Sequence, residues 1–233
     1  MYKNIMLKIS GESLAGNNEQ GFDFDILNDL SNNIKLLVEK GIKISIVLGG
    51  GNFIRGAAFS NGVVDRVTSD YMGMLGTVIN SLALQSNLEK IGIPSRVMTA
   101  ISINRVAEPY IKNKASRHLE KNRVVIFASG TGNPFFSTDT AAVLRASEMK
   151  SDIILKGTKV DGIYDKDPAS NNDAKKITQI SYADYLNKDI KVMDATAISL
   201  AKDRSLAIIV FSILKSSNIV DIVNGEGSYS VIS

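Results

Sequence analysis

Three short apolar runs in the sequence each end in a glycine-containing turn, and this repeated junction constrains the fold more than any other feature. The runs are residues 5–9, 42–48 and 124–127, and the turns after them are 10–11, 49–51 and 130–132. Short apolar runs of this kind are typical of buried strands. Helical patterns separate the runs, and strands that alternate with helices predict an α/β fold with a mainly parallel sheet.

The third junction, residues 128–146, has the most distinctive sequence. Gly130 and Gly132 allow backbone conformations with positive φ, and Ser137, Thr138 and Asp139 favour a helix N-cap before a run of helix-forming residues. A glycine-rich turn that leads into a helix offers unpaired N–H groups to an anion. An ordinary, well-capped connection explains the same residues equally well, so both interpretations remain open at this point.

Charged residues stand close to these junctions. In a parallel sheet the carboxyl ends of the strands lie at one edge, where ligands bind, so we expect all three turns at a single edge. Lys8 ends the first strand and Arg55 follows the second turn. We expect them near the carboxylates of Asp70, Asp139 and Asp167, although a lysine at a strand end can also simply reach solvent.

The composition excludes several kinds of catalysis. The chain has no cysteine and one histidine, His118, which excludes disulfides, thiolate chemistry and Cys- or His-based metal sites. Any metal should be a hard cation such as Mg²⁺, carried in with a substrate. His118 lies in a basic segment, 112–123, that we interpret as a solvated helix face with His118 at the surface.

The net charge and the distribution of apolar residues do not indicate nucleic acid or membrane partners. The net charge of +3 is too small to indicate nucleic acid or a membrane surface, and no run of 18 apolar residues or signal peptide is present. We therefore predict a soluble, cytoplasmic protein that forms a single domain over residues 1–233. Its two functional halves should meet near residue 150.

The available groups suit phosphoryl transfer. In that reaction the protein contributes positioning and positive charge more than covalent chemistry. An acceptor that is already an anion needs no general base, which agrees with the shortage of histidine. Residue chemistry alone therefore predicts a phosphotransferase that uses a magnesium nucleotide and a phosphate or carboxylate acceptor.

Three further segments carry structural predictions. Residues 65–91 form the longest helical pattern, apolar on more than one face, which favours a subunit interface over burial within the monomer. Asp161-Gly162 is a hairpin signal that predicts a polar hairpin over residues 156–168. Residues 229–232 are predicted to be an edge strand.

Five motifs together resemble one known family. They are LKISGE, VLGGGNFIRG, ASGTGNPFFSTDTAA, LKGTKVDGIYDKDP and KVMDATA, in this order along nearly the whole chain. They resemble the amino-acid-kinase superfamily and, within it, the bacterial UMP kinases. The resemblance implies a three-layer α/β/α sandwich in which residues 1–150 bind UMP and residues 151–233 bind ATP. It also implies Mg²⁺ bound with ATP.

The resemblance implies roles for individual residues. Lys8, Arg55, Asp139 and Asp194 would be catalytic, with Asp139 ordering Lys8 or Mg²⁺ and Asp194 holding Lys8. ATP would contact Lys8, Ile9, Ser10, Gly11, Gly51, Arg55, Thr158, Tyr164 and Asp167. UMP would contact Gly50, Asp70, Thr131, Gly132, Asn133, Pro134, Phe135, Phe136, Ser137 and Thr138. Asp70 would accept hydrogen bonds from the ribose hydroxyls.

The same resemblance implies an assembly and its regulation. Members of the family are typically homohexamers built from dimers, which fits the helix over residues 65–91, and many are activated by GTP and inhibited by UTP. In the loop 16–22, Gly21-Phe22 matches the pattern of GTP-responsive members, but Asp23 stands where the last glycine would be. The resemblance therefore supports UTP inhibition more than GTP activation.

Two alternatives keep the fold and change the activity. A carboxylate kinase that acts on glutamate or aspartate would find Asp70 repulsive to its acceptor. A non-catalytic regulator or storage protein that only binds nucleotides would have no use for Lys8, Arg55 and Asp139. Turnover with glutamate but not UMP would support the first, and binding of ATP and UMP without turnover would support the second.

Overall fold

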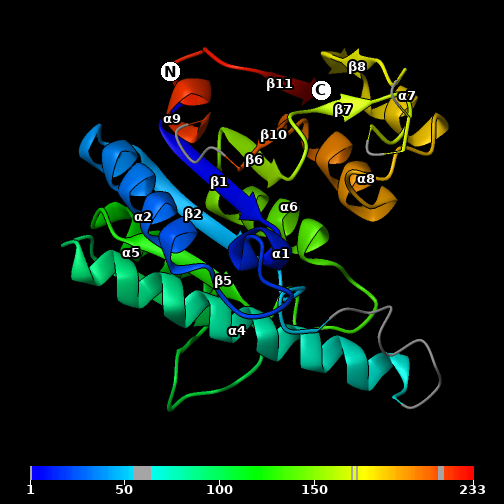
Figure 1. The fold of residues 1–233 in the computed structure, drawn as a ribbon. Helices are drawn as coiled ribbons and strands as arrows, with labels where there is room; N and C mark the ends of the chain where they lie inside the picture. The colour runs from blue at the N-terminus through cyan, green and yellow to red at the C-terminus, as the bar shows by residue number, and fades with distance from the viewer. Residues whose placement is uncertain (1, 55–63, 169, 172, 215–217) are drawn as a thin grey trace.

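A nine-stranded sheet forms the centre of the structure, a computed structural model that describes residues 2–54, 64–168, 170–171, 173–214 and 218–233 (Figure 1). Its strand order is β4-β3-β5-β2-β1-β6-β10-β11-β9. The strands are β1 (Asn4–Ile9), β2 (Lys43–Leu48), β3 (Ser95–Thr99), β4 (Glu108–Pro109), β5 (Val124–Ala128), β6 (Ile153–Thr158), β9 (Gln179–Ile180), β10 (Ile208–Ser212) and β11 (Tyr229–Ile232). Only the pair β10–β11 is antiparallel among these described strands, so the predicted mainly parallel sheet is confirmed.

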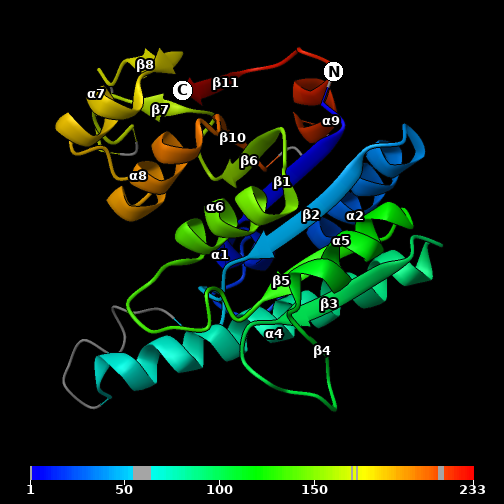
Figure 2. The same ribbon diagram turned by 180° about the vertical axis from the view of Figure 1, so that it is seen from behind.

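Helices cover both faces of this sheet, which confirms the predicted three layers (Figures 1 and 2). On one face lie α2 (Phe24–Glu39), α4 (Arg66–Lys90) and α9 (Asn218–Val223). On the other lie α5 (Lys112–Glu120), α6 (Thr138–Met149), α7 (Tyr182–Asn187) and α8 (Ala195–Arg204). The short helix α1 (Gly11–Ala15) follows β1 directly. A separate small sheet pairs β7 (Ile163–Tyr164) with β8 (Lys176–Ile177).

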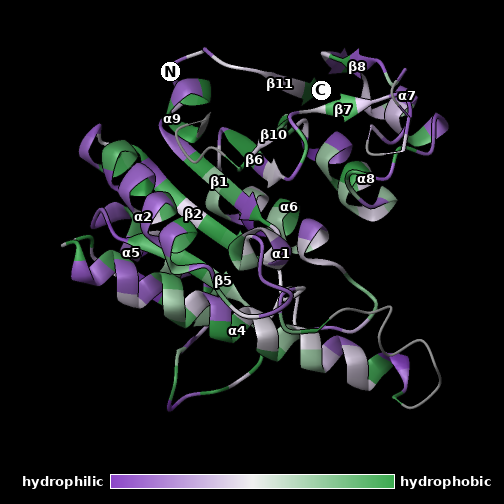
Figure 3. Cartoon of the chain, in the orientation of Figure 1, coloured by the Kyte–Doolittle hydropathy of each residue, from purple (hydrophilic) through white to green (hydrophobic). Residues whose placement is uncertain are grey.

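Each face of the sheet has its own apolar core. In β1, Ile5, Leu7 and Ile9 belong to the core under α2 and α4, whereas Met6 belongs to the core under α6 and α8. A strand buried on both faces reads as a continuous apolar run, and the strands are accordingly the most hydrophobic segments of the ribbon (Figure 3). Lys8 shares the side of β1 that Met6 occupies, so it faces α6.

Side-chain caps fix the starts of the main helices, and the N-cap predicted within Ser137–Asp139 is confirmed at Ser137. Asp23, Asp65, Ser137 and Asp194 accept hydrogen bonds from backbone N–H groups in the first turns of α2, α4, α6 and α8. Each such cap contributes about 1 kcal/mol to stability. Two of these capped termini, those of α6 and α8, open towards the same place, and that place becomes the centre of the site.

Three predictions about local structure are wrong. Asp161-Gly162 does not turn a hairpin, because β6 already pairs with β1 and β10 on its two sides, and β7 pairs with β8 instead. Residues 229–232 are not an edge strand, since β9 pairs with β11 beyond them. His118 is not a surface residue: its side chain is only 14% exposed and contacts Glu108 and Arg123.

Candidate active site

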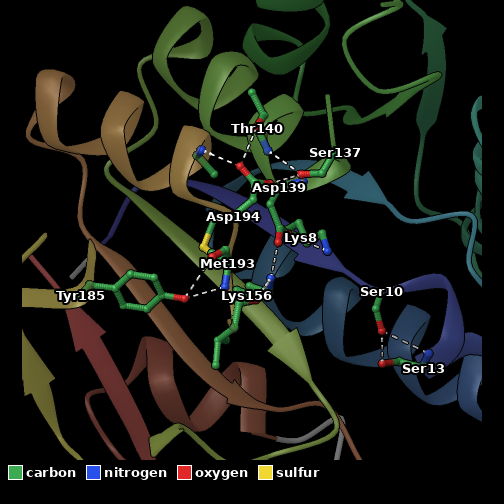
Figure 4. Close-up of polar contacts among 12 residues, drawn as sticks. Lys8, Ser10, Ser13, Ser137, Asp139, Thr140, Lys156, Tyr185, Met193 and Asp194 are labelled. Carbon is green, nitrogen blue, oxygen red and sulfur yellow. Dashed lines mark hydrogen bonds and ion pairs between the residues drawn. The ribbon is translucent and has the colours of Figure 1, made fainter. Parts of the chain in front are cut away.

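Two lysines from neighbouring strands share one carboxylate at the end of the sheet. Lys8 of β1 and Lys156 of β6 are direct partners in the parallel register. Their side chains meet Asp139 in the first turn of α6: Lys8 Nζ lies 2.7 Å from Asp139 Oδ1 and Lys156 Nζ lies 2.5 Å from Oδ2 (Figure 4). Two ammonium groups and one carboxylate leave this cluster with a net positive charge.

The cluster is buried, so its electrostatics are strong. The Asp139 side chain is 12% exposed and the two lysine side chains are 7% and 6% exposed. Burial by itself would raise the pKa of Asp139, but Lys8 and Lys156 outweigh it and hold that pKa below its usual range. Burial and the neighbouring Lys8 lower the pKa of Lys156 to about 8, against the opposing effect of Asp139 and Asp194.

Lys156 has a second anchor in the segment before α8. Its Nζ donates a hydrogen bond to the carbonyl of Val192 at 2.5 Å. The next residue, Met193, is held in turn by the buried Tyr185, whose hydroxyl accepts from Met193 N at 2.6 Å and lies 3.2 Å from the Met193 carbonyl. Burial raises the pKa of Tyr185 to about 12, so this hydroxyl stays neutral.

Asp194 has different partners from those expected. Its carboxylate accepts hydrogen bonds from Ser137 Oγ, from Thr140 Oγ1 at 3.0 Å and from Ala197 N at 2.8 Å. No ion pair joins it to Lys8 in the part of the chain that the structure describes. Because the N-cap of α8 and two hydroxyls of α6 already use its oxygens, Asp194 ties α8 to α6 and so steadies Asp139 rather than Lys8.

The glycine turns meet at this same edge, as predicted. Gly49 N donates to the Ile9 carbonyl at 2.8 Å, which joins the ends of β1 and β2. A Cβ on Gly11 would lie 2.6 Å from Gly51 N, and one on Gly50 would lie 2.5 Å from the carbonyl oxygen of Gly73 in α4. Only glycine allows these backbones to approach so closely.

A cleft of about 190 Å³ opens between these turns and α4. Of the residues expected to bind UMP, it is lined by Gly50, Asp70, Phe136, Ser137 and Thr138. Thr131, Gly132, Asn133, Pro134 and Phe135 lie in the adjoining loop and are not part of this lining. Asp70 is held in place by Arg66 Nε at 2.9 Å and by Phe135 N at 2.7 Å.

A second cleft, of about 460 Å³, lies beside Val192, the residue whose carbonyl anchors Lys156. Tyr164 and Asp167 line this cleft, and Tyr164 donates to Asp161 Oδ1. Thr158 is not in its lining and instead donates to the Val160 carbonyl at 2.7 Å. Ile9 is fully buried, and Ser10 caps α1. Arg55 lies outside the described residues.

The two clefts are joined through a third that contains Asp139. This middle cleft shares Ser137 with the first and Asp189, Ile190 and Lys191 with the second. Asp139, the carboxylate that pairs with both lysines, therefore lines the cleft that connects the other two clefts. Such an arrangement suits transfer of a negatively charged group from one side to the other.

Lys156 is the residue of the candidate site that sequence reasoning missed. The sequence places Lys156 at the start of the predicted polar hairpin over residues 156–168, whereas in the structure it lies within β6. A signal was nevertheless present, because Leu155-Lys156 repeats the Leu7-Lys8 pattern at the end of a second buried strand. Aligning the two strand ends side by side would have found the pair.

Comparison with known proteins defines the class of this chain. The model of the Amino acid kinase family matches residues 3–212. The chain belongs to the amino acid kinase family.

Individual relatives give a more specific comparison than the family as a whole. A uridylate kinase from Wolbachia pipientis wMel is 53% identical over 232 residues, which cover 100% of this chain and 94% of that protein. The crystal structure of UMP kinase from Bacillus anthracis superposes with a TM-score of 0.95 at 40% identity, covering 100% of this chain and 96% of that one. UMP kinase from Ureaplasma parvum gives a TM-score of 0.94 at 38% identity, with coverage of 100% and 99%.

Proposed function

We propose that this chain is a UMP kinase, which transfers the γ-phosphoryl group of ATP to UMP and releases UDP and ADP for pyrimidine nucleotide synthesis. The observation that carries the proposal is the Lys8–Asp139–Lys156 cluster between two clefts, in a chain whose full-length relatives are uridylate kinases. UMP occupies the cleft beside Asp70, and ATP occupies the cleft beside Tyr164 and Asp167.

The cluster acts through charge and position. Lys8 and Lys156 neutralise charge on the phosphoryl group as it passes between the clefts, and Asp139 keeps both ammonium groups in place. The UMP phosphate is already an anion, so the attacking oxygen needs no general base. Arg55, which follows the Gly49–Gly51 turn in the sequence, adds a further positive group on the phosphates.

The residues around the cluster fit a magnesium ion that arrives with ATP. Both oxygens of Asp139 face lysines, and no group of three or more His, Cys, Asp or Glu side chains converges among the described residues. Mg²⁺ commonly keeps several waters and binds through substrate phosphates, and it supplies charge neutralisation there. We assign it no protein ligand.

We also propose that copies of this chain associate through α4 into a hexamer built from dimers. Four apolar side chains recur at intervals of four residues on this helix and are 39–48% exposed: Val67, Tyr71, Leu75 and Ile79. Such a stripe on a helix face is typical of a protein interface. UTP, which resembles the acceptor, would inhibit by competing for the UMP cleft.

The protein is expected to act in the cytoplasm. No helix among the described residues is both long enough and apolar enough to span a bilayer.

Within the single domain, strands β1 to β5 carry the UMP half and β6 to β11 carry the ATP half, so the pairing of β1 with β6 forms the boundary.

The test is ADP release by the purified protein with Mg-ATP and a panel of acceptors. We expect rapid turnover with UMP and little with CMP, dUMP, glutamate, aspartate or no acceptor. Turnover with glutamate or aspartate alone would identify a carboxylate kinase instead. Binding of ATP and UMP without any turnover would identify a nucleotide-binding regulator.

A further inference from the structure

The loop between β5 and α6 contains two non-glycine residues in the left-handed region of backbone space. Ser129 has φ 63° and Phe135 has φ 71°. For an L-residue this conformation is unfavourable, so surrounding contacts must hold it. Ser129 precedes the part of the loop that we assign to UMP and Phe135 lies within it, so whatever holds them also sets the shape of the acceptor site.

Both residues are held by side chains of the same helix. Ser129 N donates to Thr77 Oγ1 at 2.7 Å, and Phe135 N donates to Asp70 Oδ2 at 2.7 Å. Asp70 and Thr77 are about two turns apart on α4 and therefore lie on the same side of it. One side of α4 thus fixes the two strained points of the loop.

The Thr77 hydroxyl is arranged to accept rather than to donate. Its proton is committed to the carbonyl of Met74, 2.6 Å away in the preceding turn of α4. Its oxygen lone pairs are then free for Ser129 N. Thr77 is 2% exposed and Ser129 is fully buried, so water cannot easily replace this bond. Loss of the hydroxyl would leave a buried N–H group without a partner.

The side chain of Ser129 does not explain its own conformation. Its Oγ is buried and makes no hydrogen bond within the described part of the structure. The group of Ser129 that Thr77 binds is therefore the backbone N–H and not the side chain. Gly130, the next residue, lines the acceptor cleft together with Thr77 itself. The contact therefore lies directly behind the wall of the cleft.

We propose that Thr77 is a positioning residue for the acceptor nucleotide: its hydroxyl holds Ser129 in the left-handed conformation that directs the loop into the UMP cleft. This inference rests on the proposed function, because it assigns UMP to that cleft. On this proposal, Thr77 affects the binding of UMP and not the binding of ATP. Among the described residues, none that lines the proposed ATP cleft also lines the acceptor cleft.

The test compares Thr77→Val with Thr77→Ser. Valine keeps the volume and loses the hydroxyl, whereas serine keeps the hydroxyl and loses the methyl group. We expect Thr77→Val to raise KM for UMP about tenfold, the effect of one lost buried hydrogen bond. KM for ATP should stay within about twofold, since α4 does not contact the ATP cleft. Thr77→Ser should behave like the wild type.

A second substitution, Ser129→Gly, tests whether Thr77 acts by holding residue 129 in the left-handed conformation. Glycine adopts positive φ freely, so Ser129→Gly should need no help from Thr77. Added to Thr77→Val, it should lower KM for UMP by about threefold, which recovers part of the loss. If Thr77→Val does not fold, Thr77→Ala removes the same hydroxyl while leaving room for water, and a smaller rise in the same KM is expected.

The outcomes separate the two proposals. A wild-type enzyme that does not turn over UMP overturns the proposed function, whatever the variants do. An active wild type overturns the role of Thr77 in any of three cases: valine or alanine leaves KM for UMP unchanged, KM for ATP rises equally, or serine is as damaging as valine.

Discussion

The lysine cluster and the acceptor loop are held in place by different forces. Lys8, Lys156 and Asp139 are buried charges that fix one another through ion pairs of 2.5–2.7 Å. The acceptor loop is fixed by neutral N–H groups that bond to Asp70 and Thr77 on α4. Under the proposed function, the charge of the cluster acts on the transferring group, whereas the contacts of the loop only set its shape. Substitutions in the cluster should therefore lower kcat, and substitutions behind the loop should raise KM.

The largest effect is expected from Asp139→Asn. It leaves two buried ammonium groups without their counter-charge, which costs stability on the order of 3–5 kcal/mol, and it releases both lysines. We expect kcat to fall by about 10³ or more, together with a lower midpoint of urea unfolding. The matched control is Asp203→Asn, an exposed position on α8. A variant that loses stability but keeps normal kcat would show that the cluster is structural.

Removal of either lysine alone should be nearly as damaging to turnover. Lys8→Ala should lower kcat by a factor on the order of 10²–10³ and leave KM for UMP close to the wild-type value, as loss of one preorganised charge does. Lys156→Ala should act in the same way, because the two lysines are equivalent around Asp139. If Lys156→Ala instead raised KM for UMP at full kcat, Lys156 would belong to the shape of the site and not to its charge.

The pH dependence tests the same charge without removing it. The pKa of Lys156 is about 8, so kcat/KM of the free enzyme should fall above pH 8 as this ammonium group loses its proton. Lys156→Arg should abolish that limb, since arginine stays charged.

The same group also affects stability. In the unfolded chain Lys156 keeps its proton up to about pH 10.5, the usual pKa of lysine, so it makes the folded protein more stable as pH rises from about 8 to 10.5. Activity and this contribution to stability should therefore change in opposite directions, which a comparison of pH–rate and pH–unfolding profiles can establish.

The smallest effect is expected at Asp194. Asp194→Asn keeps the oxygen that accepts from Ala197 N and Thr140 Oγ1 but replaces the oxygen that accepts from Ser137 Oγ, so Asp139 becomes less firmly held. We expect kcat to fall about threefold to tenfold, the effect of a weakened hydrogen bond. Asp23→Asn changes an N-cap of the same kind on α2, which packs on the opposite face of the sheet, and should leave kcat unchanged. An equal loss in both variants would mean that general weakening of helix caps, and not the link to α6, lowers the rate.

Local chemistry made most of the fold predictable. The strand and glycine-turn junctions, the caps at Asp23, Asp65 and Asp194, and the long helix α4 all depend on residues near one another in sequence. The wrong predictions concern features that depend on residues far apart in the sequence. Whether β6 forms a hairpin depends on β1 and β10, which already occupy both of its sides.

The site was predictable to the same extent. Lys8 and Asp139 stand at recognisable strand and helix ends, and the structure brings them together as expected. The partners of Asp194 depend on how α6 and α8 pack, and no local pattern contains that information. Lys156 is marked locally by the Leu-Lys pair near the end of β6, but its pairing with Asp139 depends on how α6 packs on β6. Thr77 gave no signal at all, because a threonine inside a helix is ordinary until the loop it holds is seen.

The register of β1 and β6 also has a consequence for how the chain folds. Pairing these strands before α6 docks would place Lys8 directly beside Lys156 with no counter-charge, and like charges at paired positions are unfavourable. A shift of one residue would send the two lysines to opposite faces and relieve the repulsion. In the native alignment Asp139 lies between the two lysines and offsets their repulsion. The same carboxylate therefore stabilises the strand alignment through which the two halves of the sheet join.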